Sequence, residues 1–124
     1  MTPELIAVLE QKPPIKNNLT PTFALVLQRL QNNDDLANMI VSRAELGLQR
    51  YGTYLQPDNG RCPYIDGLQE CLDLMNYMAQ ASIEVKMKTH DQAELDDIEK
   101  IFFDVASMAE FLLGKAMEKL NASA

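Results

Sequence analysis

The sequence has few residues that could cross-link the chain through disulfide bonds or zinc. It contains two cysteines, Cys62 and Cys71, and one histidine, His90, in 124 residues. Cys71 falls within an expected helix, and the two cysteines lack the spacing of a disulfide framework or a zinc site. His90 stands alone among polar residues near an expected helix start, which favours a solvated or capping role over a catalytic one. We therefore expect a reducing compartment, the cytoplasm.

Positive charge is also scarce. The chain has 11 lysine and arginine residues against 18 aspartate and glutamate residues, which gives a formal net charge of −7. Nucleic-acid binding rewards cations that neutralise the phosphate backbone. The composition therefore disfavours a nucleic-acid partner.

Long apolar runs are missing as well. Crossing a bilayer takes about 20 apolar residues, and Asp104 and Glu110 interrupt even the most apolar region, which follows Ile101. Near the amino terminus, the apolar run of residues 5–9 is too short for the core of a signal peptide. We expect a soluble protein with no export signal and no membrane partner.

The chain is long enough for one domain, residues 1–124. Its amino-terminal part contains two helix-start signals, Thr2-Pro3 and Thr20-Pro21, in which an N-cap residue precedes a proline at the first helical position. These signals predict short helices over about residues 3–11 and 21–31.

The segment 12–19 between these two helices holds two prolines and two asparagines. Such a composition is typical of an exposed linker without regular structure. Residues 1–20 are thus expected to form a helix and linker that pack only loosely on the rest.

Three longer helices are expected after this region. The first runs from Asp34, its expected N-cap, to residue 51 before Gly52, and the second covers about residues 63–85. The loop between them is rich in turn formers, which favours an antiparallel pairing of the two helices. The third covers about residues 92–120, with its apolar positions at Leu95, Ile98, Phe102, Val105, Ala109, Leu112 and Ala116. Because no segment alternates with period two, we predict an all-α bundle of about four core helices plus the short N-terminal helix.

Three acidic residues follow one another along one face of the 63–85 helix. Asp66, Glu70 and Asp73 lie at i, i+4 and i+7, with about 5–6 Å between neighbouring Cβ atoms. This row lies roughly opposite the apolar side of the helix, so the first interpretation is an ordinary face exposed to solvent. A solvated face usually mixes acids with basic residues, however, and none occurs from Cys62 to Val85. Hard cations such as Mg²⁺ need converging carboxylate oxygens, so a metal site is the second interpretation.

Glu45 on the preceding helix extends this reasoning. If the two helices are antiparallel, Glu45 and Glu70 lie roughly 9 and 10.5 Å from the loop ends of their helices and face each other. Arg50 and Arg61 flank the loop. They are placed to meet the outer phosphates of a metal-bound nucleotide, or they are scattered surface cations.

Taken together, these residues resemble the MazG-like nucleotide pyrophosphatases. Glu70-Cys71-Leu72-Asp73 matches the second-half ExxD signature of that family, and Tyr77 is similar to the tyrosine that follows this motif in several members. Small phage-encoded members that act on dATP and dGTP have a wider string similar to Arg50-Tyr51-Gly52, Asn59-Gly60-Arg61 and Asp66. The resemblance spans about residues 35–81.

One departure from the family concerns its first acidic element, which is commonly ExxE on the preceding helix. Here Glu45 has Ser42 three residues before it and Leu48 three after it. Only one of the two glutamates of the ExxE element is therefore present. Asp66 can supply the missing charge, and the number of bound metal ions stays open.

The resemblance implies hydrolysis of nucleoside triphosphates between the α- and β-phosphates, giving a monophosphate and pyrophosphate, with a leaning to purine deoxynucleotides. It implies Mg²⁺, for which Mn²⁺ substitutes, as the cofactor. The metal ligands would be Glu45, Asp66, Glu70 and Asp73. A metal-bound water needs a carboxylate to orient it for attack on the α-phosphorus, and Glu45 is the candidate base.

The remaining expectations concern substrate contacts and assembly. Arg50 and Arg61 would contact phosphates, while Asn76 and Tyr77 would border the sugar or base. A tyrosine packed at a helix interface is the other interpretation of Tyr77. Members of the family are dimers or dimers of dimers, so a homodimer or homotetramer is expected, in the host cytoplasm if a phage encodes the chain.

Two other functions fit the same residues. The first is a non-catalytic helical interaction module whose acidic face contacts a basic partner. The second is a related phosphohydrolase that cuts elsewhere in the nucleotide. Metal-dependent stabilisation separates the first from an enzyme, and product analysis separates the second.

Overall fold

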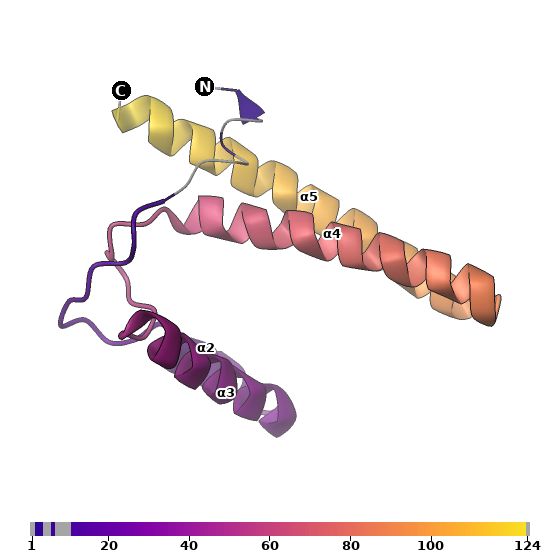
Figure 1. The fold of residues 1–124 in the computed structure, drawn as a ribbon, viewed down its shortest axis with the longest axis horizontal. Helices are drawn as coiled ribbons and strands as arrows, with labels where there is room; N and C mark the ends of the chain where they lie inside the picture. Colours follow the sequence, from indigo (N-terminus) through magenta and orange to yellow (C-terminus); the bar gives the residue numbers. More distant parts are fainter. Residues whose placement is uncertain (1, 4–5, 7–10, 124) are drawn as a thin grey trace. The chain divides into compact units, whose positions relative to one another are not determined.

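The computed structural model describes residues 2, 3, 6 and 11–123. They form four helices, in the order α2 (Phe23–Arg29), α3 (Asp34–Tyr51), α4 (Pro63–Lys88) and α5 (Gln92–Ser123), and no strand occurs among them (Figure 1). The prediction of an all-α fold is confirmed. The short helix expected over residues 3–11 falls largely outside the described residues.

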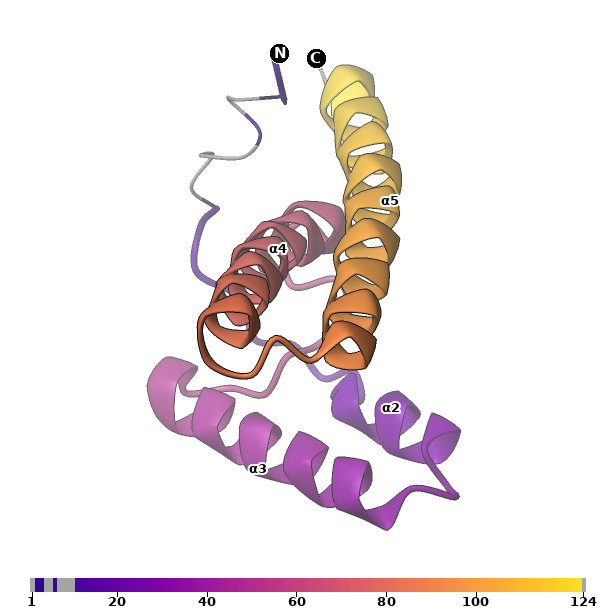
Figure 2. The same cartoon turned by 90° about the vertical axis from the view of Figure 1, so that its right-hand side faces the viewer.

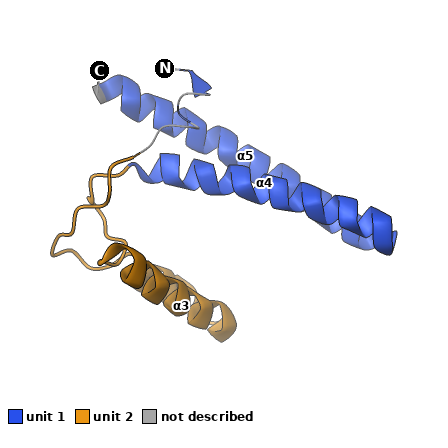
Figure 3. Cartoon of the chain, viewed as in Figure 1, with its two compact units in different colours: residues 1–10, 62–124 blue, residues 11–61 orange. Residues whose placement is uncertain are grey.

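The chain divides into two compact units (Figure 3). One consists of residues 1–10 and 62–124 and contains α4 and α5, and the other consists of residues 11–61 and contains α2 and α3. The expected antiparallel pairing of α3 with α4 joins residues of different units, so it stays a prediction. The single domain over residues 1–124 also stays a prediction.

Helices α4 and α5 form an antiparallel hairpin and lie side by side along their length (Figures 1 and 2). Ile65 and Leu68 of α4 are buried against Ala109 and Ala116 of α5, and Ile6 joins the same core. Along α5, Leu95, Ile98 and Val105 are also buried. The apolar positions spaced by three and four residues along α5 therefore include the face that packs on α4.

The carboxyl-terminal ends of α4 and α5 lie three residues beyond their predicted ends. At its other end, α4 starts with a proline, which suits a position where no backbone donor is needed. The helix reaches Lys88, because the first residue to leave the helical region is His90, with φ of 56°. The His90 backbone N–H donates to the Val85 carbonyl at 2.8 Å and closes the helix.

No described helix is long and apolar enough to cross a membrane.

Two predicted N-cap residues are wrong. The Asn33 side chain, not Asp34, caps α3 by accepting a hydrogen bond from the Leu36 backbone N–H at 3.1 Å. Asn33 precedes the first helical residue, which is the position where a side-chain oxygen reaches the unpaired amides. The N-cap of α2 is Thr22 instead of Thr20, and its hydroxyl donates outside the helix, to the Leu55 carbonyl at 3.3 Å.

The segment 12–19 is irregular, as predicted, but side chains tie it to the loop 53–61. Gln56, 8% exposed, accepts from the Asn17 backbone N–H and donates to the carbonyls of Asn17 and Leu19 at 2.8–3.0 Å. The Ile15 backbone N–H donates to the Asn59 carbonyl at 2.9 Å. This segment is therefore a strap tied across the loop, and most of its residues are exposed, as predicted.

Two glycines, one inside α3 and one at its end, differ in what a side chain would cost. Gly52 ends α3 at φ of 74°, where a side chain is strained, whereas Gly47 lies inside the helix, and neither has an atom within 4 Å of an added Cβ. We expect Gly52→Ala to destabilise the fold by about 1 kcal/mol and Gly47→Ala to stabilise it by roughly 0.5–1 kcal/mol. Urea unfolding of both variants measures this, and equal signs would contradict the left-handed end at Gly52.

Candidate functional site

Three of the acidic residues of α4 lie on the side of the helix opposite its buried apolar residues. Glu70 and Asp73 are exposed and Asp66 is half-buried, whereas Ile65 and Leu68 of the same helix are buried in the core. A helix places residues four apart on successive turns of one face. These three residues therefore form a row along one face, which we call the α4 acidic row (Asp66, Glu70 and Asp73), and Glu70 and Asp73 are exposed to solvent.

Little positive charge lies near this row in the sequence of α4. Within the described part of the chain, the side chains of Glu70 and Asp73 make no hydrogen bond and no ion pair, and the first basic residue of α4 is Lys86. Asp66 lies in the first turn of α4, where its negative charge interacts favourably with the positive end of the helix dipole. The like charges of Glu70 and Asp73, three residues apart, repel each other in the absence of a cation.

The carboxylates of the α4 acidic row do not converge on one point. Among residues 2, 3, 6 and 11–123, no three histidine, cysteine, aspartate or glutamate side chains converge on one point that could hold a metal ion. The chemistry of the row still fits Mg²⁺, because the ion takes one or two protein carboxylates and keeps its other positions for water and phosphate. The residues available to hold the ion are Glu70 and Asp73, with Asp66 one turn away.

Glu45, the candidate base, lies on the exposed face of α3 and has one neighbour that sequence reasoning missed. The Tyr54 hydroxyl donates a hydrogen bond to Glu45 Oε1 at 2.8 Å. This bond, with some burial and the negative charge of Glu45, raises the pKa of Tyr54 above its ordinary value. One feature of the sequence could have indicated this contact, namely Gly52, because a turn at this glycine returns the chain toward α3.

The two arginines have different surroundings. Arg50 is exposed in the last turn of α3. Arg61 is half-buried, and its Nη1 donates to the Lys12 carbonyl at 2.8 Å. Arg61 thus helps to hold the start of the strap, and phosphate binding by either arginine stays a prediction.

Asn76 and Tyr77 follow the α4 acidic row along the helix. The Asn76 side chain donates to the Leu72 carbonyl of its own helix at 3.0 Å. Tyr77 is 61% exposed, so α5 does not cover it. Packing between the two helices of this unit therefore does not account for Tyr77, and its contact with a sugar or base stays a prediction.

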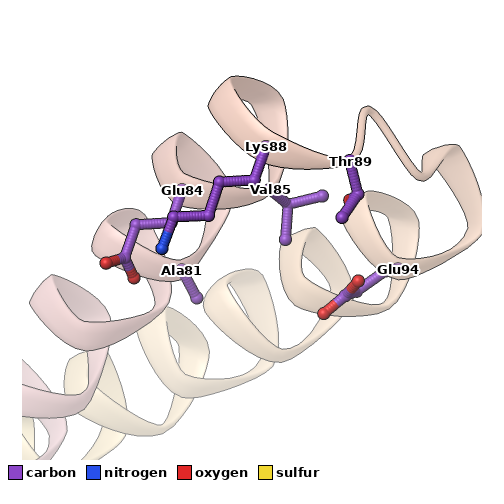
Figure 4. A pocket seen from close by; sticks show the side chains of 6 residues that line it. All are labelled: Ala81, Glu84, Val85, Lys88, Thr89 and Glu94. Carbon is purple, nitrogen blue, oxygen red and sulfur yellow. The ribbon is translucent and has the colours of Figure 1, made fainter.

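A shallow depression of about 280 Å³ lies at the other end of α4, beside the turn into α5 (Figure 4). It is lined by Ala81, Glu84, Val85, Lys88, Thr89 and Glu94. Ala81 is eight residues beyond Asp73, about 12 Å along the helix axis. The depression is thus separate from the α4 acidic row.

Comparisons with known proteins add no relative: no protein-family model, curated protein or solved structure matches this chain. A function must therefore be inferred from the residues themselves and from the motif resemblance.

The metal-free stability of Glu70→Gln tests the repulsion within the α4 acidic row. Removing one of three like charges is expected to stabilise the fold by a few tenths of a kcal/mol. Asp104→Asn is the matched control, because Asp104 pairs with Lys100 at 2.6 Å on α5 and its loss should destabilise by a similar amount. Thermal melts in the presence of a chelator measure both changes. Destabilisation by Glu70→Gln would mean that Glu70 has a favourable partner.

Proposed function

We propose that this chain is a metal-dependent nucleoside triphosphate pyrophosphatase of the MazG-like kind. It hydrolyses the bond between the α- and β-phosphates and releases a monophosphate and pyrophosphate, with purine deoxynucleotides as the favoured substrates. The observation that carries the proposal is the α4 acidic row, whose Glu70 and Asp73 are exposed on a helix that has no basic residue between Cys62 and Val85.

Electrostatics explain why such a row suits a triphosphate only through a cation. A triphosphate is strongly anionic, and Asp66, Glu70 and Asp73 would repel it directly. When bound, Mg²⁺ or Mn²⁺ supplies charge neutralisation and a more acidic water. The residues that would hold the ion are Glu70 and Asp73, with Asp66 and Glu45 as further ligands.

The other residues have roles in positioning and proton transfer. Glu45 orients the attacking water and accepts its proton as the water oxygen bonds to the α-phosphorus and pyrophosphate leaves. Arg50 and Arg61 neutralise the outer phosphates. Asn76 and Tyr77, farther along α4, contact the sugar or base.

Glu70→Gln and Asp73→Asn test this function directly. We expect Mg²⁺ to raise the melting temperature of the wild-type protein and to have no such effect on the two variants. Pyrophosphate release should fall by about a hundredfold or more in each, the usual scale for the loss of a metal ligand or general base. The measurement is a screen of common ribo- and deoxynucleoside triphosphates that quantifies monophosphate and pyrophosphate together.

Glu110→Gln is the control for charge alone, because Glu110 is an exposed acid of α5 outside the proposed site. It should retain wild-type turnover. Turnover within a factor of a few in Glu70→Gln would remove the metal site and favour the helical interaction module. Release of free phosphate instead of pyrophosphate would indicate a phosphohydrolase with another cleavage position.

We further propose that the protein is a homo-oligomer, a dimer or a tetramer. Large apolar side chains remain exposed on both long helices, among them Phe103 (64%), Phe111 (60%) and Leu74. Apolar surface of this kind is normally covered in an interface. Cys71 and Met78, which also widen the apolar arc of α4, are half-buried.

Light scattering at micromolar concentration tests the assembly. We expect a mass of two or four chains, and Phe103→Glu combined with Phe111→Glu should shift the protein toward smaller species if α5 contributes to the interface. A folded wild-type monomer of 14.0 kDa would contradict this proposal.

A further inference from the structure

Glu45 is held by a contact that links residues nine positions apart in the chain. The Tyr54 hydroxyl donates to Glu45 Oε1 at 2.8 Å, a short and well-formed hydrogen bond. The second carboxylate oxygen, Oε2, has no hydrogen-bond partner among the described residues. One oxygen of Glu45 is thus engaged by the protein, and the other is left for a water or a cation.

Two further contacts within this unit involve Tyr54, one at its ring and one at its backbone. Its ring packs against Phe23 of α2, with 5.1 Å between the ring centroids and a tilt of 54°. The Thr53 hydroxyl donates to the Tyr54 carbonyl at 3.0 Å. The ring contact with Phe23 is independent of the hydrogen bond to Glu45.

The next residue ties the same loop to the start of α2. The Leu55 carbonyl accepts hydrogen bonds from the Thr22 backbone N–H at 2.9 Å and from the Thr22 hydroxyl at 3.3 Å. Together with the left-handed turn at Gly52, these bonds set the path by which the chain returns from the end of α3. Tyr54 therefore stands on a loop that is hydrogen-bonded to the start of α2.

We propose that Tyr54 is a positioning residue that holds the Glu45 carboxylate in one orientation for catalysis. This inference rests on the proposed function, because it assigns the purpose of the bond to the attacking water. A glutamate on an exposed helix face samples several rotamers, and a fixed hydrogen bond selects one of them. The selected rotamer keeps Oε2 available for the water while Oε1 stays bonded to Tyr54.

Tyr54→Phe separates the hydrogen bond from the ring. The variant retains the contact with Phe23 and loses only the hydroxyl. We expect kcat for pyrophosphate release to fall about tenfold, the lower end of the range for loss of a residue that orients a catalytic group. KM for the nucleotide should stay within about twofold, because Tyr54 orders the base and not the substrate. Tyr51→Phe is the matched control, since Tyr51 is an exposed tyrosine of the same helix end, and it should retain wild-type rates.

A double-mutant cycle distinguishes positioning from a general structural role. If Tyr54 acts only through Glu45, Tyr54→Phe should lower the residual rate of Glu45→Gln no further. Independent, additive losses would overturn the inference, and so would a Tyr54→Phe enzyme within about twofold of wild-type kcat while Glu45→Gln is inactive. In both of those cases the proposed function stands. A wild-type protein that releases no pyrophosphate from any nucleoside triphosphate would instead overturn the function and this inference together.

Discussion

The packing of α4 against α5 is the contact on which the arrangement of the α4 acidic row depends. Ile65 and Leu68 are buried in that contact, and the helix is continuous from Pro63 to Lys88, so the position of one face determines the position of every other. Since the apolar face must leave water, the acidic residues of the opposite side must remain in it. The exposure of Glu70 and Asp73 is therefore a consequence of how the core is built.

That arrangement leaves Glu70 and Asp73 without an ion-pair partner among the described residues. A protein that needed only a soluble surface would gain from a lysine three or four residues from each acid. On α5, Lys100 forms such an ion pair with Asp104. Helix α4 does not use this device between Cys62 and Val85. We therefore infer that a cation from outside the chain compensates the repulsion. A divalent cation bound as proposed would do so and would also supply chemistry.

Much of the fold could be predicted from local patterns, because Gly52, Pro63 and the periodicity of α5 act on the backbone within a few residues. The contacts that escaped prediction are of another kind. Gln56 binds Asn17 across 39 positions of sequence, and no local propensity encodes that pairing. The bond from Tyr54 to Glu45 depends on the path of the loop after α3, which a pattern of turn formers leaves undefined. The acidic row could be predicted because it requires only helical spacing.

The position of bond cleavage tests the proposed chemistry most directly. Reaction of the wild-type protein with dGTP and Mg²⁺ in water labelled with heavy oxygen reveals which phosphorus the water attacks. We predict that the label appears in the monophosphate and not in pyrophosphate, because a water oriented by Glu45 bonds to the α-phosphorus. Label in pyrophosphate, or the failure of any nucleoside triphosphate to yield these two products, would contradict the proposed function.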